Sequence, residues 1–369
     1  MTQMERRKNT WQIRIGSVAV GGGAPVSVQS MTNTDTRSPE ATLAQLRALA
    51  EAGCDIARLA VPDFEAAEAL ESILPSSPLP LVADIHFDYR LALAAIRAGV
   101  SAIRINPGNI GAPDRVRAVV EAAGEACIPI RVGANAGSLP KGLLEKELAK
   151  GLSREEALAE ALVRAAMEQV KMLEEFSFDR IKVSLKSSSV PVTVQAYRRF
   201  AARSDYPLHI GVTEAGTVFR GTVKSAVGIG TLLMEGIGDT LRVSLTADPV
   251  EEVRTGIAIL EAAGLRRSAP EIVSCPTCGR TAYDMFSLVD QVERFVESVK
   301  AEGRRIGVRK IAVMGCVVNG PGEAADAEIG IAGGGEGGKL MLFRYGKTIA
   351  VLPESEAFER LKTEILKHS

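Results

Sequence analysis

The sequence is poor in the features that mark several broad protein classes. Only five of its 369 residues are cysteines, too few and too unevenly spaced for a secreted disulfide framework. No apolar run is long enough to cross a bilayer, and the charged N-terminal segment MTQMERRKNTWQIRIG is unlike a secretory signal. We therefore expect a cytoplasmic protein that does not span a membrane.

An excess of either charge is also lacking. The 44 basic and 45 acidic residues give a formal net charge of -1. Nucleic acids and anionic membranes are recruited by a strong positive field, so neither is an expected partner. Any site for an anion must be built locally.

From residue 24 onward, short apolar segments rich in β-branched residues alternate with amphipathic segments, a pattern typical of βα units. The predicted strands are 24–30, 55–61, 80–86, 102–106, 128–133, 180–186, 207–212 and 240–245. Eight such units predict a TIM (β/α)8 barrel, and an open doubly wound sheet is the alternative. The long connection over 133–156 is either a lid or an added surface helix.

The pattern changes after residue 267. A helix is predicted over 284–302, followed by the strand KIAVMG, and the Gly-rich GGGEGG (333–338) is expected to join two strands because it lacks the Lys-Ser/Thr of a phosphate-binding loop. We predict two domains, an α/β barrel over 1–267 and a small α+β domain over 268–369.

Polar residues gather at the carboxyl ends of the predicted strands, where TIM barrels carry their catalytic groups. The basic ones include Arg58, Arg104, Arg131, Lys186 and Arg242. Burying them is costly without counter-charge, and Asp84 and Glu214 are too few to balance them. A phosphate or diphosphate ligand is therefore expected, although single basic residues could instead pair with carboxylates at the rim.

Smaller polar groups occur at the same strand ends. Asn106 shares a strand face with Arg104, because side chains alternate with period 2, and Asn135 and Ser244 follow other strands. His86 lies two residues from Asp84, which makes it a candidate for proton transfer or hydroxyl binding. A hydrogen-bonded structural histidine is the alternative.

The motif CPTCG (275–279) is typical of metal sites, because two thiolates at this spacing can hold one ion. Cys316 is the only further thiol downstream, which leaves a structural zinc site one ligand short. Three thiolates suit an iron–sulfur cluster with one open iron. Glu323, seven residues after Cys316 across the NGPG turn, is a candidate fourth ligand or simply a surface glutamate.

Seven segments together resemble the 4-hydroxy-3-methylbut-2-enyl diphosphate synthase family in its shorter bacterial form. They are VQSMTNTDT, RINPGNIG, NAGSL, HIGVTEAG, EGIGDTLRVSLT, SCPTCGR and GCVVNGPGEA. The resemblance covers nearly the whole chain. It implies conversion of 2-C-methyl-D-erythritol 2,4-cyclodiphosphate to 4-hydroxy-3-methylbut-2-enyl diphosphate by a two-electron reductive elimination of water, with a [4Fe–4S] cluster, on the methylerythritol phosphate route to isoprenoids.

The resemblance also implies roles for individual residues. The cluster ligands would be Cys275, Cys278, Cys316 and Glu323. The diphosphate would be held by Arg58, Arg104, Arg131, Lys186, Arg242 and Ser244. The reacting end would be lined by Asp84, His86, Asn106, Asn135 and Glu214, with Glu214 or His86 protonating the departing hydroxyl. Flavodoxin or ferredoxin would donate electrons, and a head-to-tail homodimer would bring the cluster domain of one subunit to the barrel of the other.

Two other functional hypotheses compete with this one. A pterin-type synthase would also bind a diphosphate at the barrel mouth, with CPTCG serving only as a zinc clip. A non-enzymatic electron-transfer module would need four protein thiolates, and only three cysteines lie after residue 270.

Overall fold

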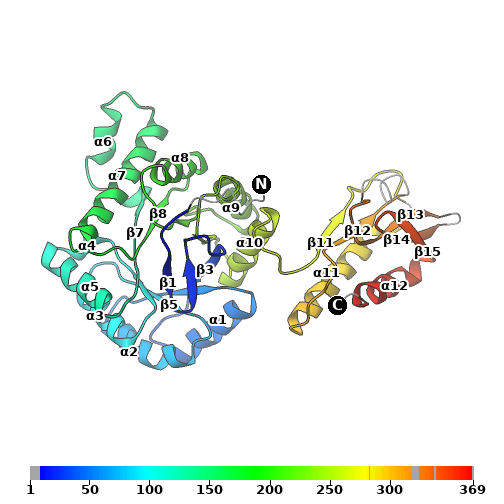
Figure 1. Cartoon of the computed structure of the whole chain (residues 1–369), viewed down its shortest axis with the longest axis horizontal. Helices are drawn as coiled ribbons and strands as arrows, with labels where there is room; N and C mark the ends of the chain where they lie inside the picture. Colours follow the sequence, from blue (N-terminus) through cyan, green and yellow to red (C-terminus); the bar gives the residue numbers. More distant parts are fainter. Residues whose placement is uncertain (1–8, 282, 317–323, 336–337, 368–369) are drawn as a thin grey trace. The chain divides into compact units, whose positions relative to one another are not determined.

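The computed structural model describes residues 9–281, 283–316, 324–335 and 338–367. It divides into two compact units, Met1–Arg266 and Arg267–Ser369 (Figure 1). Among the helices described, none is both long and apolar enough to cross a membrane.

The first unit is a TIM barrel. Its strands are β3 (Ser27–Met31), β4 (Ile56–Ala60), β5 (Leu81–Asp84), β6 (Ala102–Arg104), β7 (Ile130–Asn135), β8 (Ile181–Lys186), β9 (His209–Ile210) and β10 (Thr240–Leu241). They pair in parallel in the order β8-β7-β6-β5-β4-β3-β10-β9. A parallel bridge between Val183 and Leu208 joins the two outer strands. The predicted barrel is confirmed, and the open-sheet alternative is wrong because the ring closes.

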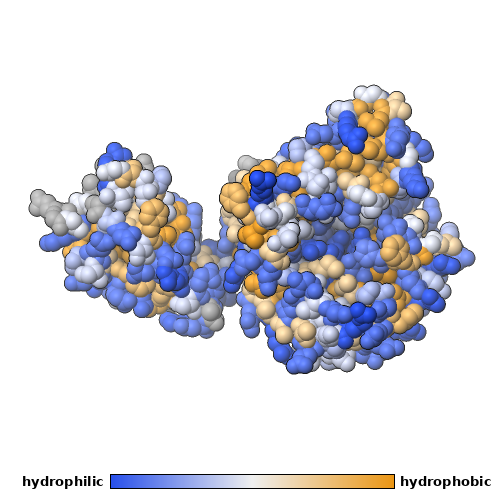
Figure 2. All heavy atoms as spheres, turned by 180° about the vertical axis from the view of Figure 1, so that it is seen from behind, coloured by the Kyte–Doolittle hydropathy of each residue, from blue (hydrophilic) through white to orange (hydrophobic). Residues whose placement is uncertain are grey.

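Helices surround the barrel strands (Figure 1). They are α1 (Pro39–Glu51), α2 (Phe64–Ile73), η2 (Leu74–Ser76), α3 (Tyr89–Ala98), α4 (Pro107–Ile110), α5 (Pro113–Glu125), α7 (Arg154–Glu174), α8 (Val190–Ala201), α9 (Val218–Met234) and α10 (Pro249–Ala262). Asp63, Asp88 and Asp248 begin three of them by accepting a hydrogen bond from a backbone N–H of the first turn. The outer surface mixes hydrophilic and hydrophobic side chains (Figure 2).

An N-terminal hairpin that the sequence did not predict covers the amino ends of the barrel strands. It consists of β1 (Ile13–Ile15) and β2 (Val18–Val20), paired antiparallel. Its buried side chains form one cluster with residues at or near the starts of three barrel strands, namely Ile56, Val82 and Ala102. The polar residues at the carboxyl ends therefore lie at the opposite end from the hairpin.

The long connection after β7 contains η3 (Ala136–Ser138) and α6 (Leu143–Leu148). Leu143 belongs to the barrel unit's hydrophobic core. The fully buried Glu147 forms ion pairs with Lys150 of the same segment and with Arg164 of α7. These contacts anchor the segment to α7. The segment therefore contains a short helix packed on α7, and its role as a lid stays a prediction.

In its described residues, the second unit is a five-stranded mixed sheet with two helices. The elements are β11 (Glu271–Ser274), α11 (Met285–Ala301), β12 (Lys310–Met314), β13 (Ile329–Gly335), β14 (Lys339–Arg344), β15 (Lys347–Leu352) and α12 (Glu354–Leu366). The strand order follows the chain, with β11, β12 and β13 parallel and the last two strands antiparallel. The predicted α+β class is confirmed. The Gly-rich segment begins within β13, and residues 336–337 of its expected connection to β14 lie outside the described residues.

Period-2 alternation divides this sheet into two faces. Ile311 and Val313 pack with α11 and α12 in one cluster. Ala312 and Met314 belong to a second cluster, which Ala324 and the half-buried Cys275 join. One face is thus covered by helices, and Cys275, which also packs against the first cluster, lies at the edge between the two faces.

Candidate substrate and cluster sites

A row of charged residues crosses four neighbouring barrel strands. Asp84 of β5 is the register partner of Arg104 in β6. Arg104 is in turn the partner of Arg131 in β7, and Arg131 is the partner of Lys182 in β8. Register partners on parallel strands project from the same face of a sheet, so the four side chains point the same way. All four are buried. The structure therefore brings the predicted Asp84, Arg104 and Arg131 together and adds Lys182.

Asp84 is the centre of the ion pairs in this row. Its carboxylate lies 3.8 Å from Arg58 Nε, 3.4 Å from Arg104 Nη1 and 3.5 Å from His86 Nε2. Burial raises the pKa of Asp84, but the contact with His86 and the charges of Arg58 and Arg104 outweigh it and hold that pKa well below its ordinary value. Asp84 is therefore an anion that neutralises part of the basic cluster.

The ion pairs among the described residues leave the rest of this positive charge without a carboxylate partner. The buried basic residues are Arg58, Arg104, Arg131, Lys182 and Lys186, whereas the buried carboxylates paired with basic residues at this end are Asp84 and Glu252. Nε and Nη1 of Arg131 have no hydrogen-bond partner within the described residues. Burial, followed by the charge of Arg131, holds the pKa values of Lys182 and Lys186 well below their ordinary value. Such a cluster is an electrostatic site for a multiply charged anion.

Two arginines meet the thioether of Met31. Arg58 Nε and Nη2 lie 3.2 and 3.0 Å from Met31 Sδ, and Arg242 Nη1 lies 3.8 Å from it. Burial lowers the pKa of Arg58 to about 10. A thioether is a weak acceptor, so these guanidinium groups keep most of their hydrogen-bonding capacity for a ligand.

Sequence reasoning missed Glu252, whose carboxylate lies 3.5 Å from Arg242 Nε. It belongs to the buried side of α10 together with Val253, Gly256 and Leu260. A carboxylate in an otherwise apolar helical stripe is the signal that could have identified it.

Two glycines make room at the carboxyl ends of the strands. A Cβ on Gly133 would lie 2.2 Å from Ser184 Oγ, and a Cβ on Gly211 would lie 2.4 Å from Arg242 O and 3.0 Å from Lys186 Nζ. A larger residue at position 133 would displace Ser184, and one at position 211 would displace the Arg242 backbone and the Lys186 side chain. Close approach, rather than backbone conformation, requires glycine here.

The other predicted site residues are less buried or hold structural contacts. Asn135 and Ser244 are half-buried, and Asn106 Oδ1 accepts a hydrogen bond from Gly108 N, which caps α4. Glu214 is exposed, and its φ of 51° lies in the left-handed region, which is uncommon for a residue with a Cβ. His86 has 56% of its side chain exposed and lies at the rim.

His209 is a hydrogen-bonded structural histidine. It is fully buried, and its Nδ1 is 2.7 Å from Thr240 Oγ1. Burial and the charge of Lys186 hold the pKa of His209 well below its ordinary value, so the ring is neutral.

The second unit places two of the predicted metal ligands at the ends of adjacent parallel strands. Cys275 follows β11, and Cys316 comes two residues after the end of β12. Gly315 N donates a hydrogen bond to Cys275 Sγ over 3.2 Å, which joins the two loops. Cys278 is exposed in a turn where Thr281 N donates to its carbonyl oxygen. Backbone N–H groups directed at a cysteine sulfur are typical of metal and iron–sulfur sites.

Glu323 and the NGPG turn lie outside the described residues. Ala324, the next residue, is buried in the same cluster as Met314 and Cys275. Within the described part of the chain, no three His, Cys, Asp or Glu side chains are already close enough to hold a metal ion. The cysteine loops fit a cluster by their donor chemistry and their hydrogen bond, and the complete ligand set stays a prediction.

Comparison with known proteins identifies both units. The GcpE TIM-barrel domain matches residues 10–257, and the GcpE protein C-terminal domain matches residues 271–367. The chain is 54% identical to the 4-hydroxy-3-methylbut-2-en-1-yl diphosphate synthase (flavodoxin) of Geobacter sulfurreducens, over 98% of both chains. It is 52% identical to the enzyme of the same name from Clostridium acetobutylicum, over 98% of this chain and 99% of that one.

Among solved structures, the barrel is similar to a dihydropteroate synthase from Coxiella burnetii in complex with pteroic acid. The TM-score is 0.50 at 10% sequence identity, over 69% of this chain and 98% of that one. At this identity the similarity concerns the fold alone. The alternative of a pterin-type synthase is therefore not supported.

Proposed function

Because this chain belongs to the family of 4-hydroxy-3-methylbut-2-en-1-yl diphosphate synthases, we propose that it converts 2-C-methyl-D-erythritol 2,4-cyclodiphosphate to 4-hydroxy-3-methylbut-2-enyl diphosphate. The reaction opens the cyclic diphosphate, consumes two electrons and releases one hydroxyl group as water. The observation that carries the proposal is the group of five buried basic residues at that end of the barrel. Among the described residues, one buried carboxylate, Asp84, forms ion pairs with members of this group, Arg58 and Arg104.

The basic cluster binds the diphosphate in this proposal. The contacting residues are Arg58, Arg104, Arg131, Lys186, Arg242 and Ser244. Arginine offers paired N–H groups that match phosphate oxygens, and the ammonium group of Lys186 adds a point charge. The negative charge of the ligand offsets the cost of burying these cations, which the protein alone leaves uncompensated.

His86 is the better candidate for the acid that protonates the departing hydroxyl. The lowered pKa of Asp84 keeps that carboxyl deprotonated, so Asp84 orients its neighbours and donates no proton. His86 Nε2 lies 3.5 Å from the Asp84 carboxylate, which can orient the imidazole at the rim of the barrel. Glu214 is the second candidate, and Asn106 and Asn135 complete the proposed lining of the reacting end.

We assign Cys275, Cys278, Cys316 and Glu323 as ligands of a [4Fe–4S] cluster in the domain 268–369. When bound, such a cluster supplies single electrons and a Lewis-acidic iron. The support from this chain is the Gly315 N–H donated to Cys275 Sγ and the burial of Ala324 beside the same loop. The relatives are named for flavodoxin, which makes flavodoxin the proposed electron donor and ferredoxin the alternative.

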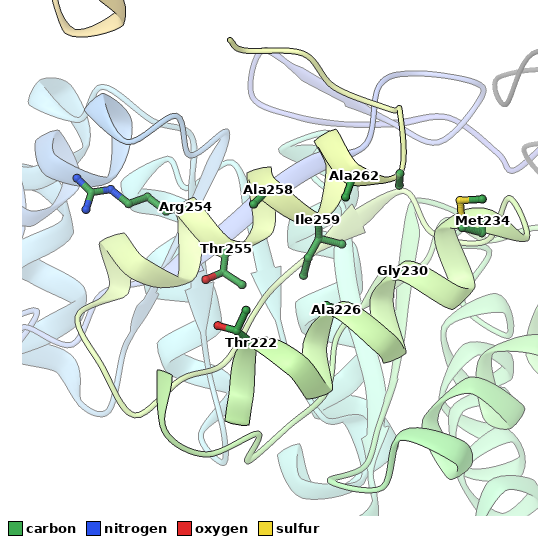
Figure 3. Close-up of a pocket in the computed structure, with 10 residues that line it drawn as sticks. Thr222, Ala226, Gly230, Met234, Arg254, Thr255, Ala258, Ile259 and Ala262 are labelled. Carbon is green, nitrogen blue, oxygen red and sulfur yellow. The ribbon is translucent and has the colours of Figure 1, made fainter. Parts of the chain in front are cut away.

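A head-to-tail homodimer is the proposed assembly, and an apolar surface of the barrel unit is the proposed subunit contact. Phe219, Val223 and Val227 recur every four residues on α9 and are at least half exposed. Beside them, residues of α9 and α10 line an open pocket of about 520 Å³. Figure 3 shows Thr255 and Ile259 of α10 pointing toward α9. Exposed apolar surface of this kind marks association sites. The cytoplasmic location stays a prediction.

Metal analysis of anaerobically purified protein tests this function. We expect about four iron and four sulfide per chain, and an EPR signal of the reduced protein that changes when the cyclic diphosphate is added. Cys316→Ser should remove the cluster and turnover while inorganic pyrophosphate still raises the Tm of the barrel. Cys127→Ser, at an exposed cysteine of the barrel unit, is the matched control and should keep both. Stoichiometric zinc without sulfide would refute the proposal.

A further inference from the structure

The carboxylate of Glu252 connects three separate segments at the barrel mouth. Its Oε1 accepts a hydrogen bond from Leu245 N over 3.0 Å. Its Oε2 accepts one from Ser30 Oγ over 3.3 Å and lies 3.5 Å from Arg242 Nε. Glu252 is 5% exposed, so these interactions occur where water weakens them little.

These contacts determine how Arg242 is presented. Its backbone N–H donates to Ile210 O over 3.0 Å, which holds the residue at the end of β10. The Nε side of its guanidinium faces Glu252, and Nη1 faces the thioether of Met31. Nε thus faces the Glu252 carboxylate as an ion pair without a hydrogen bond, and Nη1, part of the fork that grips phosphate oxygens, meets a weak acceptor at Met31.

The same carboxylate holds the segment that carries Ser244. The N–H of Leu245 is bonded to Glu252, and Leu245 directly follows Ser244. Arg242 lies two residues before Ser244. Both proposed diphosphate contacts of this loop are therefore tied to one side chain on α10. Fixing them before the ligand arrives removes rotamer and loop entropy from the cost of binding.

We propose that Glu252 is a positioning residue that pre-orients Arg242 and the Ser244 loop for the diphosphate. This inference rests on the proposed diphosphate role of Arg242. It assigns to Glu252 no contact with the substrate, and its effect is exerted through the arginine.

Glu252→Gln tests the inference because the amide keeps an oxygen for Leu245 N and loses the charge that holds Arg242. We expect the Kd for inorganic pyrophosphate and the KM for the cyclic diphosphate to rise about tenfold. The kcat should stay within about twofold, because the electron-transfer steps do not involve this carboxylate. Iron content and absorbance should be unchanged. Glu251→Gln, at the exposed neighbouring carboxylate, is the matched control and should leave both constants unaltered.

A double-mutant cycle separates positioning from simple stabilisation. If Glu252 acts through Arg242, Glu252→Gln should add no further loss in an Arg242→Ala background. Additive losses, or an unchanged Kd in the single Glu252 variant, would overturn the inference. If Arg242→Ala itself leaves pyrophosphate binding unchanged, the proposed diphosphate site is wrong instead. Where the amide variant fails to fold, Glu252→Met, of similar volume and without charge, replaces it. Because Met also removes the acceptor for Leu245 N, its cycle is run in an Arg242→Ala, Ser244→Ala background.

Discussion

Single residues at the barrel mouth are placed for ligand binding at the expense of stability. Arg131 is 5% exposed, and two of its guanidinium nitrogens have no hydrogen-bond partner in the described part of the chain. A buried, partly unsatisfied cation costs free energy, and the structure tolerates it because the rest of the barrel core is apolar and well packed. A buried charge without full hydrogen bonding is typical of sites that bind a charged ligand.

Arg131→Met therefore has opposite effects on stability and binding. We expect the free energy of unfolding of the ligand-free protein to stay unchanged or rise by about 1 to 3 kcal/mol, because an apolar side chain replaces a buried charge. The affinity for inorganic pyrophosphate should fall at least roughly tenfold, since a charge-assisted contact is lost. Thermal unfolding with and without pyrophosphate measures both. Arg47→Met, on the exposed face of α1, should change neither. A destabilised Arg131 variant that still binds pyrophosphate would contradict this account.

Lys186 makes binding depend on pH. Burial and the charge of Arg131 hold the pKa of Lys186 well below its ordinary value in the ligand-free protein. A bound diphosphate is negatively charged and therefore raises this pKa again. The complex therefore binds a proton that the ligand-free protein has lost, and the affinity falls as the pH rises past the ligand-free pKa. Between that pKa and about 10.4 the unfolded chain holds the extra proton, so the stability of the ligand-free protein rises with pH.

Calorimetry in two buffers of different ionisation enthalpy measures this proton uptake. Pyrophosphate binding to the unaltered protein should take up more protons than binding to Lys186→Met, which also corrects for the titration of the ligand itself. Lys171→Met, at an exposed lysine of α7, should behave like the unaltered protein. Equal uptake by all three proteins would show that Lys186 stays charged without ligand.

Among the secondary-structure elements, β8 and β9 form the weakest junction of the barrel. Among the described residues they are joined by one parallel bridge, between Val183 and Leu208, and β9 is only two residues long. Tyr197 of α8 reinforces the junction, because its hydroxyl accepts from Leu185 N over 3.1 Å and donates to His209 O over 2.6 Å. A side chain thus replaces part of the missing strand ladder.

Tyr197→Phe removes that reinforcement with little change in shape. Leaving Leu185 N and His209 O buried without the hydroxyl should cost about 1 to 3 kcal/mol of unfolding free energy. Pyrophosphate affinity should also fall, because Lys186 directly follows Leu185 at the end of β8. Urea unfolding and calorimetry measure the two effects. Tyr345→Phe, at a tyrosine that is 60% exposed, should leave both unchanged.

For the whole chain, a head-to-tail dimer predicts complementation between two inactive variants. Cys316→Ser keeps an intact barrel, and Arg131→Met keeps an intact cluster domain. In a mixed dimer one active site then joins the two intact parts, so co-expressed subunits should show about a quarter of normal activity when they pair at random. Assayed well below the KM, Cys316→Ser alone should show almost no activity, and Arg131→Met alone no more than about a tenth of normal activity. Activity no greater than the sum of the separate variants would mean that each site lies within one subunit.

Periodicity in the sequence was sufficient to predict the barrel and the class of the second unit. Alternating strand and helix patterns depend on local spacing, and eight βα units of ordinary length close in few ways. The same local reasoning missed the β1–β2 hairpin, because two three-residue strands leave no measurable period. The basic residues could also be predicted to gather, since strand ends in a parallel barrel lie at one edge.

Tertiary structure alone decided which charges compensate one another. Asp84 meets Arg58 and Arg104 because strand register aligns β4, β5 and β6, and register is not written in any one segment. Glu252 reaches Arg242 because α10 packs back against the barrel, bringing together groups that local patterns treat separately. Residue types and periodicity are properties of short stretches of chain, whereas electrostatic balance depends on distances that exist only after the chain has folded.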